Sequence, residues 1–378
     1  MASGYILKRS ETCWIARVEH NSNGRRRYFS KSFSTEDGAK THLQNQQSAK
    51  NKGEFVEPSK VTMAVLMDEW LESVRLRVAE RTADGYQGLL DRYVRPVLGS
   101  KRVNQLETRD IQKLYANMQN HQSLSARVVR HTHATLRQVL EQGVEWKLIA
   151  RNPADSLRRK LPKAVEVERR VLDEEEAGKF LIACQVKPRG LIFEFALLSG
   201  MRPEEFLALQ WRDLNLERGT ASVRRVLVRH KGAWRFHEPK TKGSRRPVSI
   251  PTSLMRKLAT HKRIQSEQRL KVGSEWQSHD LVFCSEIGTP LSVPNLTYRY
   301  YRPILTAAGI PRIRLYDLRH SCATLLLAAD EHIKIVSERL GHSTTRLTLD
   351  TYSHVLASMQ QKTSDKLEAM LYSKKTGT

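Results

Sequence analysis

Four short segments in the C-terminal half combine side chains that can bind an anion, transfer a proton and supply a nucleophile. In the first, residues 198–205 (LSGMRPEE), Gly200 can end one helix and Pro203 suits the first turn of the next. Arg202 then lies at the corner between the helices, and an arginine beside a helix N-terminus is suited to hold an anion. An ordinary helix corner with a surface arginine is the commoner interpretation of this segment alone.

The second segment, residues 239–246 (PKTKGSRR), lies between two predicted strands and forms the tip of a predicted hairpin. Its four cations are Lys240, Lys242, Arg245 and Arg246. They would either contact a phosphate or form an ordinary charged turn, and the charged turn is commoner.

The third and fourth segments add two tyrosines. Residues 315–324 (LYDLRHSCAT) open an apolar helix and place Tyr316 and Arg319 three positions apart, on one helix face. A Leu-Gly-His triplet ends at His342, and Tyr352 follows ten residues later. A single tyrosine at such a position is usually a packed aromatic side chain. The order of all four segments is therefore the evidence that distinguishes a catalytic tyrosine from a packed one.

That order and its gaps resemble the tyrosine recombinase (phage integrase) family. The matching motifs are Gly-Met-Arg-Pro-Glu-Glu, a hairpin lysine, aromatic-Asp-Leu-Arg-His, Leu-Gly-His and a tyrosine ten residues on. The resemblance is close over 168–360 and weaker over 61–165. It implies an enzyme that cleaves and rejoins DNA through a 3′-phosphotyrosyl intermediate without ATP, metal or another cofactor. The lack of a GxxxxGK[ST] loop in the sequence fits this expectation.

The resemblance also implies a role for each side chain. Phosphodiester exchange needs a nucleophile, stabilisation of charge on the non-bridging oxygens, and a proton donor for the departing oxygen. Tyr352 is expected to be the nucleophile. Arg202 and Arg319 are expected to hold the scissile phosphate through their planar, permanently charged guanidinium groups. His342 is expected to hydrogen-bond the same phosphate.

Two roles are less closely defined by the family pattern. Lys240 is the expected general acid for the leaving 5′ oxygen, and Lys242 is the alternative because the turn length leaves the register open. The family usually has histidine three residues before the second arginine, where this chain has Tyr316. A phenol with a pKa of about 10 is a poor proton acceptor at neutral pH but still hydrogen-bonds a phosphate oxygen. We therefore expect a positioning role for Tyr316, with any base role weakened or taken by His342 or water.

Composition favours a polyanion as the partner. The 378 residues include 64 Lys and Arg against 40 Asp and Glu, a formal net charge of +24. A basic but well-solvated surface is the alternative. The 39% hydrophobic content excludes wholesale disorder, and four dispersed cysteines support neither a zinc site nor a disulfide framework. With no apolar run long enough for a bilayer and no signal core, we expect an intracellular protein without membrane contact. The family resemblance further implies the bacterial cytoplasm, in association with the nucleoid.

The fold class expected is multidomain, beginning with a small β-sheet-plus-helix domain over residues 1–57. Alternating patterns predict strands at 5–7, 14–18 and 26–33, followed by a polar helix to about residue 50. This unit resembles the three-stranded domain with which many phage and conjugative-element integrases bind arm-type sites. Its expected DNA contacts are Arg25, Arg26 and Arg27.

Residues 61–160 are expected to form an all-α helical bundle that binds the core DNA site. One helical stripe comprises Met63, Leu66, Met67, Trp70, Leu71 and Val74. Further helices are predicted at 82–94, from about 110, and at 125–146. Residues 157–163 (LRRKLPK) have the composition of a basic linker. Arg158, Arg159 and Lys160 are expected to follow a phosphate backbone, although a solvated hinge fits equally well.

Residues 168–378 are expected to form the catalytic domain, mixed α/β and mainly helical, with a C-terminal tail. Helices are predicted at 173–184, 189–199 and 203–210, and strands at 221–229, 234–239 and 246–250, before mostly helical structure. In the tail after Tyr352, residues 359–370 are predicted to form an amphipathic helix that either docks on a neighbouring protomer or packs on its own domain.

The leading hypothesis is an integrase that joins a mobile element to a chromosome and, with helper proteins, excises it. The expected partners are double-stranded DNA with core-type and arm-type sites, further copies of the chain in a tetramer, a directionality factor and a DNA-bending host protein. The alternatives are an Xer-like resolvase or type IB topoisomerase, and a non-catalytic DNA-binding regulator on the same scaffold. The N-terminal β unit disfavours the resolvase, which needs no second DNA specificity.

Overall fold

The computed structural model describes residues 4–22, 25–51, 59–120, 122–163, 170–239 and 242–372. It contains two compact units, Met1–Val167 and Glu168–Thr378. The boundary between them lies beside the one predicted near residue 160–168. A further division of the first unit near residue 57–61 stays a prediction. None of the helices in the described ranges combines the length and the apolar composition that a membrane crossing requires.

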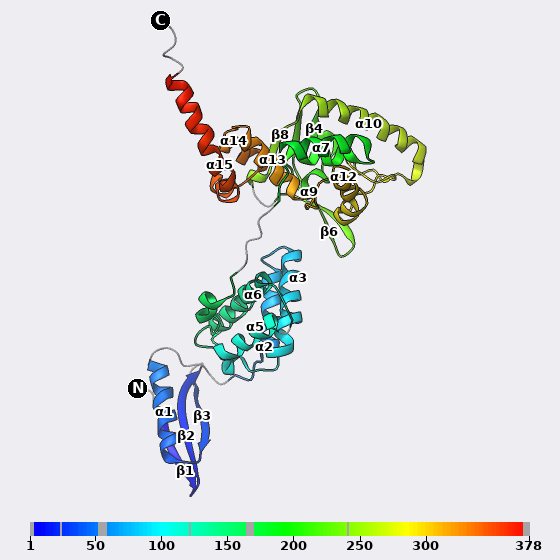
Figure 1. Ribbon diagram of the computed structural model, residues 1–378. Coiled ribbons are helices and arrows are strands. Elements are labelled where there is room, and N and C mark those ends of the chain that lie inside the picture. The colour runs from blue at the N-terminus through cyan, green and yellow to red at the C-terminus, as the bar shows by residue number, and fades with distance from the viewer. Residues whose placement is uncertain are drawn as a thin grey trace. The chain divides into compact units, whose positions relative to one another are not determined.

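The first unit begins with an antiparallel sheet and a helix (Figure 1). Its elements are β1 (Gly4–Ser10), β2 (Cys13–Ser22), β3 (Arg25–Phe33) and α1 (Glu36–Asn51). Ala16 and Val18 are buried on the face covered by α1, where Leu43 lies so close to Gly4 that a Cβ would collide with it. The intervening residues, including Tyr5 and Arg17, therefore project from the opposite face.

The same unit continues as a helical bundle with a core of its own. It comprises α2 (Met63–Arg75), α3 (Glu80–Leu89), the π-helix η1 (Leu90–Val94), α4 (Arg95–Leu98), the 3-10 helix η2 (Val103–Gln105), α5 (Thr108–Asn120), α6 (Ala126–Glu145) and the 3-10 helix η3 (Asp155–Lys160). All six apolar residues of the predicted stripe are buried in α2, which Thr62 caps by accepting a hydrogen bond from the Val65 amide.

The predicted linker at 157–163 is wrong over its first part. Asp155–Lys160 forms η3, in which Leu157 is 1% exposed and belongs to the bundle core. Asp155 also accepts a hydrogen bond from Arg137 of α6, 2.6 Å between Nε and Oδ1. Apolar burial and this ion pair hold the segment on the bundle, so the basic residues 158–160 lie within a folded element.

The second unit, residues 168–378, is mainly helical, and its described part contains two small sheets. It begins with α7 (Glu174–Val186), α8 (Gly190–Ser199), α9 (Pro203–Phe206) and η4 (Trp211–Asp213). The strands are β4 (Leu214–Asn215), β5 (Thr220–Val223), β6 (Val226–His230), β7 (Ala233–His237) and, after η5 (Lys242–Ser244), β8 (Arg246–Ser249). The rest is α10 (Thr252–Val272), η6 (Gly273–Glu275), α11 (Val293–Leu296), η7 (Thr297–Tyr301), α12 (Arg302–Ala307), α13 (Asp317–Ala328), α14 (Ile333–Leu340) and α15 (Thr345–Tyr372).

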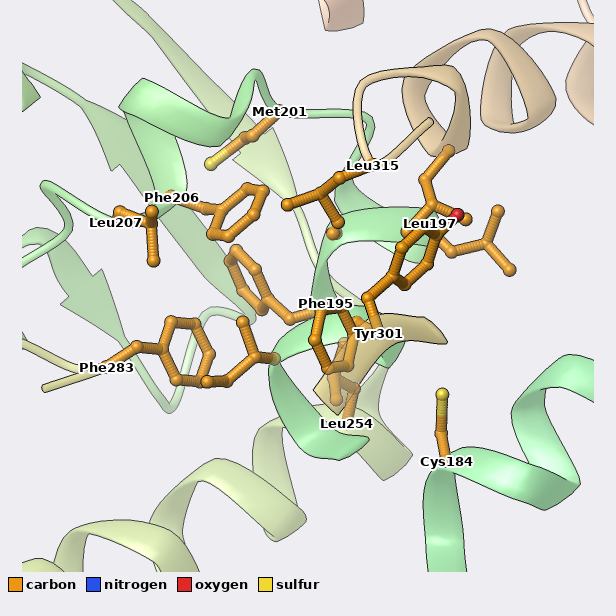
Figure 2. Close-up of a cluster of buried hydrophobic side chains, with 14 of the residues drawn as sticks. Cys184, Phe195, Leu197, Met201, Phe206, Leu207, Leu254, Phe283, Tyr301 and Leu315 are labelled. Carbon is orange, nitrogen blue, oxygen red and sulfur yellow. The ribbon is translucent and has the colours of Figure 1, made fainter. Parts of the chain in front are cut away.

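An aromatic core joins these elements. Figure 2 shows Phe195 of α8 with Phe206, Phe283 and Tyr301 among buried aliphatic side chains. The rings of Phe195 and Phe283 lie 5.5 Å apart at an interplanar angle of 62°, the edge-to-face geometry that aromatic pairs prefer. Most of the apolar run of α8 is therefore buried, with Leu191 and Leu198 partly buried against the same core.

The sheet topology corrects the predicted hairpin around residues 239–246. β7 pairs with β6, whereas β8 pairs with β5, so the basic segment connects two different sheets. The single strand predicted at 221–229 is divided between β5 and β6, which belong to different sheets. Arg225 lies at the break and forms an ion pair with the buried Asp213 carboxylate. The helix predicted at 203–210 is limited to the short α9.

Candidate active site

Arg202 lies in the turn between α8 and α9. Gly200 ends α8 with a φ of +65°, a left-handed conformation that glycine adopts without strain. A Cβ on Gly200 would also lie only 3.1 Å from the Cys322 sulfur, so this turn packs closely on α13. Arg202 follows as the N-terminal cap of α9, and its guanidinium stays partly accessible. The predicted helix corner is therefore present, and its arginine is available to an anion.

Glu205 holds this arginine in place from one turn further on. The Glu205 Oε1 accepts a hydrogen bond from Arg202 Nη1 at 2.6 Å, and Oε2 accepts one from the Arg202 backbone amide at 3.0 Å. Its second partner is Arg246, whose Nη2 lies 3.0 Å from Oε2. Burial alone would raise the pKa of Glu205, but Arg246 and Arg202 lower it below its usual value. Glu205 is thus an ionised carboxylate shared by two arginines.

Arg319 is buried at the start of α13, with 2% of its surface exposed. Its Nη1 donates to the Gly200 carbonyl at 2.8 Å, and its Nη2 donates to the Leu340 carbonyl at 2.6 Å. These bonds tie the ends of α8 and α14 to one guanidinium group. Burial and the neighbouring charge of Arg202 lower the pKa of Arg319 to about 10, so the group stays protonated at neutral pH.

His342 follows α14 through a tight glycine turn. Gly341 has a φ of +67°, and a Cβ there would lie 2.7 Å from Arg246 Nη1. Arg246 Nε donates to the Arg339 carbonyl at 2.5 Å, which links this turn to β8. The His342 Nδ1 lies 2.8 Å from the hydroxyl of the buried Thr348 in α15. Burial, with the charges of Arg319 and Arg202, lowers the pKa of His342 to about 4, so its imidazole is neutral at pH 7.

Tyr352 is fully packed in α15, with 1% of its surface exposed. The helix is kinked there, since Tyr352 has φ −120° and ψ 19°. Its hydroxyl lies 2.8 Å from Nδ1 of His320, a buried residue of α13. The sequence alone did not single out His320, because its only distinguishing signal is its place immediately after Arg319.

Tyr316 occupies the position just before α13 and is 39% exposed. Its ring lies 5.4 Å from that of His320, which in turn lies 5.7 Å from the ring of Tyr352. Burial lowers the pKa of the Arg202 guanidinium, but Glu205 and the Tyr316 hydroxyl outweigh this effect and raise that pKa above its usual value. Tyr316 therefore links the accessible arginine to the aromatic side chains beside Tyr352.

Five of the predicted catalytic residues gather in this cluster: Arg202, Tyr316, Arg319, His342 and Tyr352. Lys240 lies outside the described residues, and Lys242 is described only as the first backbone position of η5. The predicted DNA contacts Arg158, Arg159 and Lys160 are exposed in η3. Arg25, Arg26 and Arg27 belong to β3, but their side chains lie outside the described part of the chain.

Comparison with known families identifies the unit that contains this cluster. A model of the phage integrase family matches residues 170–359, which include all five gathered residues. The chain belongs to the phage integrase family. A second model, the N-terminal SAM-like domain of phage integrases, matches residues 62–119 of this integrase-family chain. The predicted family is thus confirmed, as is the enzyme class, a tyrosine recombinase that cleaves and rejoins DNA.

Two curated relatives of this integrase-family chain cover most of its length. A protein named tyrosine recombinase XerC-like from Caldanaerobacter subterraneus is 29% identical over 371 residues, 93% of each chain. The ICEBs1 integrase of Bacillus subtilis is 31% identical over 252 residues, 66% of this chain and 67% of that protein.

Solved structures show the same fold at lower identity. The Tn1549 transposon integrase, in complex with transposon right end DNA, has a TM-score of 0.68 and 18% identity, covering 80% of this chain and 99% of that one. A lambda integrase tetramer bound to a Holliday junction has a TM-score of 0.56 and 18% identity, covering 90% of this chain and 96% of that one. The predicted multidomain, mainly helical fold class is confirmed.

Proposed function

We propose that this chain is the integrase of a mobile element, which joins the element to a chromosome and excises it with helper proteins. The observation that carries the proposal is the cluster in which two arginines, a neutral histidine and a buried tyrosine come from separate segments of one unit. Relatives named as integrases, including the ICEBs1 integrase, support the proposal that the substrate is the DNA of a mobile element.

Arg202 and Arg319 would hold the scissile phosphate. A guanidinium has five N–H donors in a rigid fork, and two of those on Arg319 donate to the Gly200 and Leu340 carbonyls. Those bonds fix the plane of the group before DNA arrives, so little reorganisation is needed when negative charge builds up on the phosphate. Arg202, held by Glu205, would supply the second, more accessible charge.

His342 would add a neutral hydrogen-bond donor. When Thr348 donates to Nδ1, the imidazole carries its proton on Nε2, the atom that would face a phosphate oxygen. In the cleavage step, the Tyr352 oxygen attacks phosphorus and the bond to the 5′ oxygen breaks. Lys240 would protonate that leaving oxygen, with Lys242 as the alternative, and a 3′-phosphotyrosyl linkage would remain.

The other partners of the chain belong to the same proposal. Residues 1–57 would bind arm-type sites, residues 61–160 the core-type site, and four copies would assemble on DNA, as in the lambda integrase tetramer on a Holliday junction. Residues 168–378 would act as the catalytic domain. A directionality factor and a DNA-bending host protein would complete the complex in the bacterial cytoplasm, in association with the nucleoid.

The decisive experiment traps the covalent intermediate. Duplexes that carry a candidate attachment site and a nick beside the cleavage position lose the short strand after cleavage, so the adduct accumulates. We expect wild-type protein to form an adduct whose peptide contains Tyr352, and Tyr352→Phe to bind the same DNA without forming it. Cognate DNA recovered free of peptide from the wild-type reaction would overturn the proposal.

A second assay tests the alternatives. A type IB topoisomerase would relax a supercoiled plasmid that lacks an attachment site, whereas an integrase is expected to require the site. Recombination that survives in Tyr352→Phe would favour the non-catalytic regulator. An Xer-like resolvase would recombine two core-type sites with no contribution from an arm-type site.

A further inference from the structure

Among the described residues, the cluster contains two histidines, His320 and His342, and His320 is the one in contact with the nucleophile. His342 Nδ1 is engaged with Thr348. His320 Nδ1 instead lies 2.8 Å from the Tyr352 hydroxyl, within the range of an ordinary hydrogen bond to oxygen. The family pattern used above includes no role for the residue after the second arginine, so His320 is an additional candidate for the chemistry.

We propose that His320 is the proton acceptor that activates Tyr352 for attack on the DNA phosphate. This proposal rests on the proposed integrase function, because it assigns a further catalytic residue to the same reaction. His320 is catalytic in the strict sense, since it touches the oxygen that forms the new bond.

Geometry favours His320 over the other groups considered for this role. Tyr316 occupies the position of the usual family histidine, but a phenol with a pKa of about 10 accepts a proton poorly at neutral pH. Water has restricted access to the Tyr352 hydroxyl, because Tyr352 and His320 are both buried. His320 brings a basic nitrogen directly to that oxygen, and imidazole is the side chain best matched to proton transfer near neutral pH.

The position of His320 on α13 gives the arrangement a structural logic. His320 follows Arg319, whose guanidinium is fixed to Gly200 and Leu340. One helix therefore positions both a phosphate-binding group and the proton acceptor. Tyr352 comes from α15, which packs on α13. Docking of α15 on α13 thus brings the nucleophile to its proposed base.

The proton inventory of the step is complete. The Oη–H bond of Tyr352 breaks as the bond from Oη to phosphorus forms, and the proton passes to His320 Nδ1. The bond from phosphorus to the 5′ oxygen breaks, and that oxygen takes its proton from Lys240. In rejoining, a 5′ hydroxyl attacks phosphorus and gives its proton to the lysine, while the departing tyrosine oxygen recovers its proton from His320.

The test uses His320→Asn, because an asparagine oxygen can replace Nδ1 as a hydrogen-bond acceptor but cannot take up the proton. Single-turnover cleavage is measured on the nicked duplex with either an ordinary phosphodiester or a 5′-bridging phosphorothiolate, whose thiolate leaves without an acid. We expect His320→Asn to bind DNA normally and to cleave both substrates about 100-fold more slowly or worse. The matched control, Lys240→Ala, is expected to be slow on the phosphodiester and restored on the phosphorothiolate.

A second measurement separates lost proton transfer from altered packing. Replacing Tyr352 with 3,5-difluorotyrosine, whose hydroxyl is more acidic, is expected to restore much of the cleavage lost in His320→Asn. Cleavage by His320→Asn at nearly the wild-type rate, a defect that disappears on the phosphorothiolate, or a defect that difluorotyrosine leaves unchanged would each overturn the role of His320. Absence of any Tyr352 adduct in the wild-type protein would instead overturn the proposed function.

Discussion

At the scale of single residues, Tyr316 shows how the environment defines a role that residue type leaves open. A phenol replaces the usual histidine of the family, and its hydroxyl interacts with Arg202 at the accessible edge of the cluster. We expect Tyr316→Phe to slow covalent adduct formation about 10-fold to 100-fold, the cost of losing the hydrogen bond expected from its hydroxyl to the charged phosphate. Tyr316→His is expected to remain active. Adduct formation by Tyr316→Phe at the wild-type rate would show that the hydroxyl has no part in cleavage.

His342 provides a second prediction, in the pH dependence of stability. Its pKa is about 4 in the folded chain and about 6.5 when unfolded, so the unfolded state binds more protons between these values. The stability that neutral His342 contributes is therefore present above about pH 6.5 and is lost as the pH falls towards about 4. We expect His342→Gln to show a shallower fall in melting temperature over this range, measured by circular dichroism without DNA. An unchanged slope would contradict the perturbed titration of His342.

At the scale of elements, Arg246 connects the strand after the basic segment to two catalytic turns. Arg246 forms an ion pair with Glu205, the carboxylate that also binds Arg202. It lies so close to Gly341 that a Cβ there would collide with it, and it donates a hydrogen bond to the Arg339 carbonyl, shortly before His342 in the chain. Arg246→Ala leaves the Glu205 carboxylate with one partner fewer in a buried site. We expect it to lower the free energy of unfolding by about 3–5 kcal/mol and to reduce adduct formation, measured by denaturant titration and on the nicked duplex.

The adjacent Arg245 provides the matched control for Arg246. Its side chain is 52% exposed and pairs with Glu238, which is also exposed. Exposed ion pairs contribute little to the free energy of unfolding, so Arg245→Ala is expected to change it by about 1 kcal/mol or less. Equal losses in the two variants would show that Arg246 acts only through general charge and not through its contacts.

The elements also show which features local sequence can predict. The stripe from Met63 to Val74 predicted α2 because the burial of a helix face follows its own 3.6-residue period. Local sequence predicts a linker at the Leu157 segment, because the burial of Leu157 depends on α6 and the rest of the bundle, which no local pattern contains. The pairing of β8 with β5 was missed for the same reason, since the whole β6–β7 ribbon intervenes.

The candidate site divides in the same way. Motif order predicts Arg202, Arg319, His342 and Tyr352 as site residues, because it carries information across the chain. It assigns no role to His320 and gives Arg246 only as one of four cations, because their contacts are with residues 32 and 41 positions away. Such contacts form only in the folded structure, where α13 packs on α15 and β8 lies beside the α9 turn.

At the scale of the whole molecule, the net charge of +24 predicts DNA affinity that falls steeply with salt. This attraction does not depend on DNA sequence, whereas cleavage is proposed to depend on the cluster in residues 168–378. The proposed arm-type contact can therefore be tested apart from catalysis. The sheet face opposite α1 suits such a contact, because Tyr5 and Tyr28 are exposed there and Arg17 donates to the Tyr5 hydroxyl at 3.1 Å.

We expect Arg17→Glu to weaken binding to arm-type DNA about 10-fold or more, since a favourable charge near the phosphates becomes a repulsive one. Adduct formation on a short core-type duplex is expected to stay at the wild-type rate. Lys40→Glu, which changes an exposed charge on α1, is the matched control and is expected to have the smaller effect. Fluorescence anisotropy with labelled duplexes measures both variants. Equal losses from the two substitutions would indicate general electrostatic attraction, and reduced core-site cleavage in Arg17→Glu would show that the sheet is not a separate DNA-binding surface.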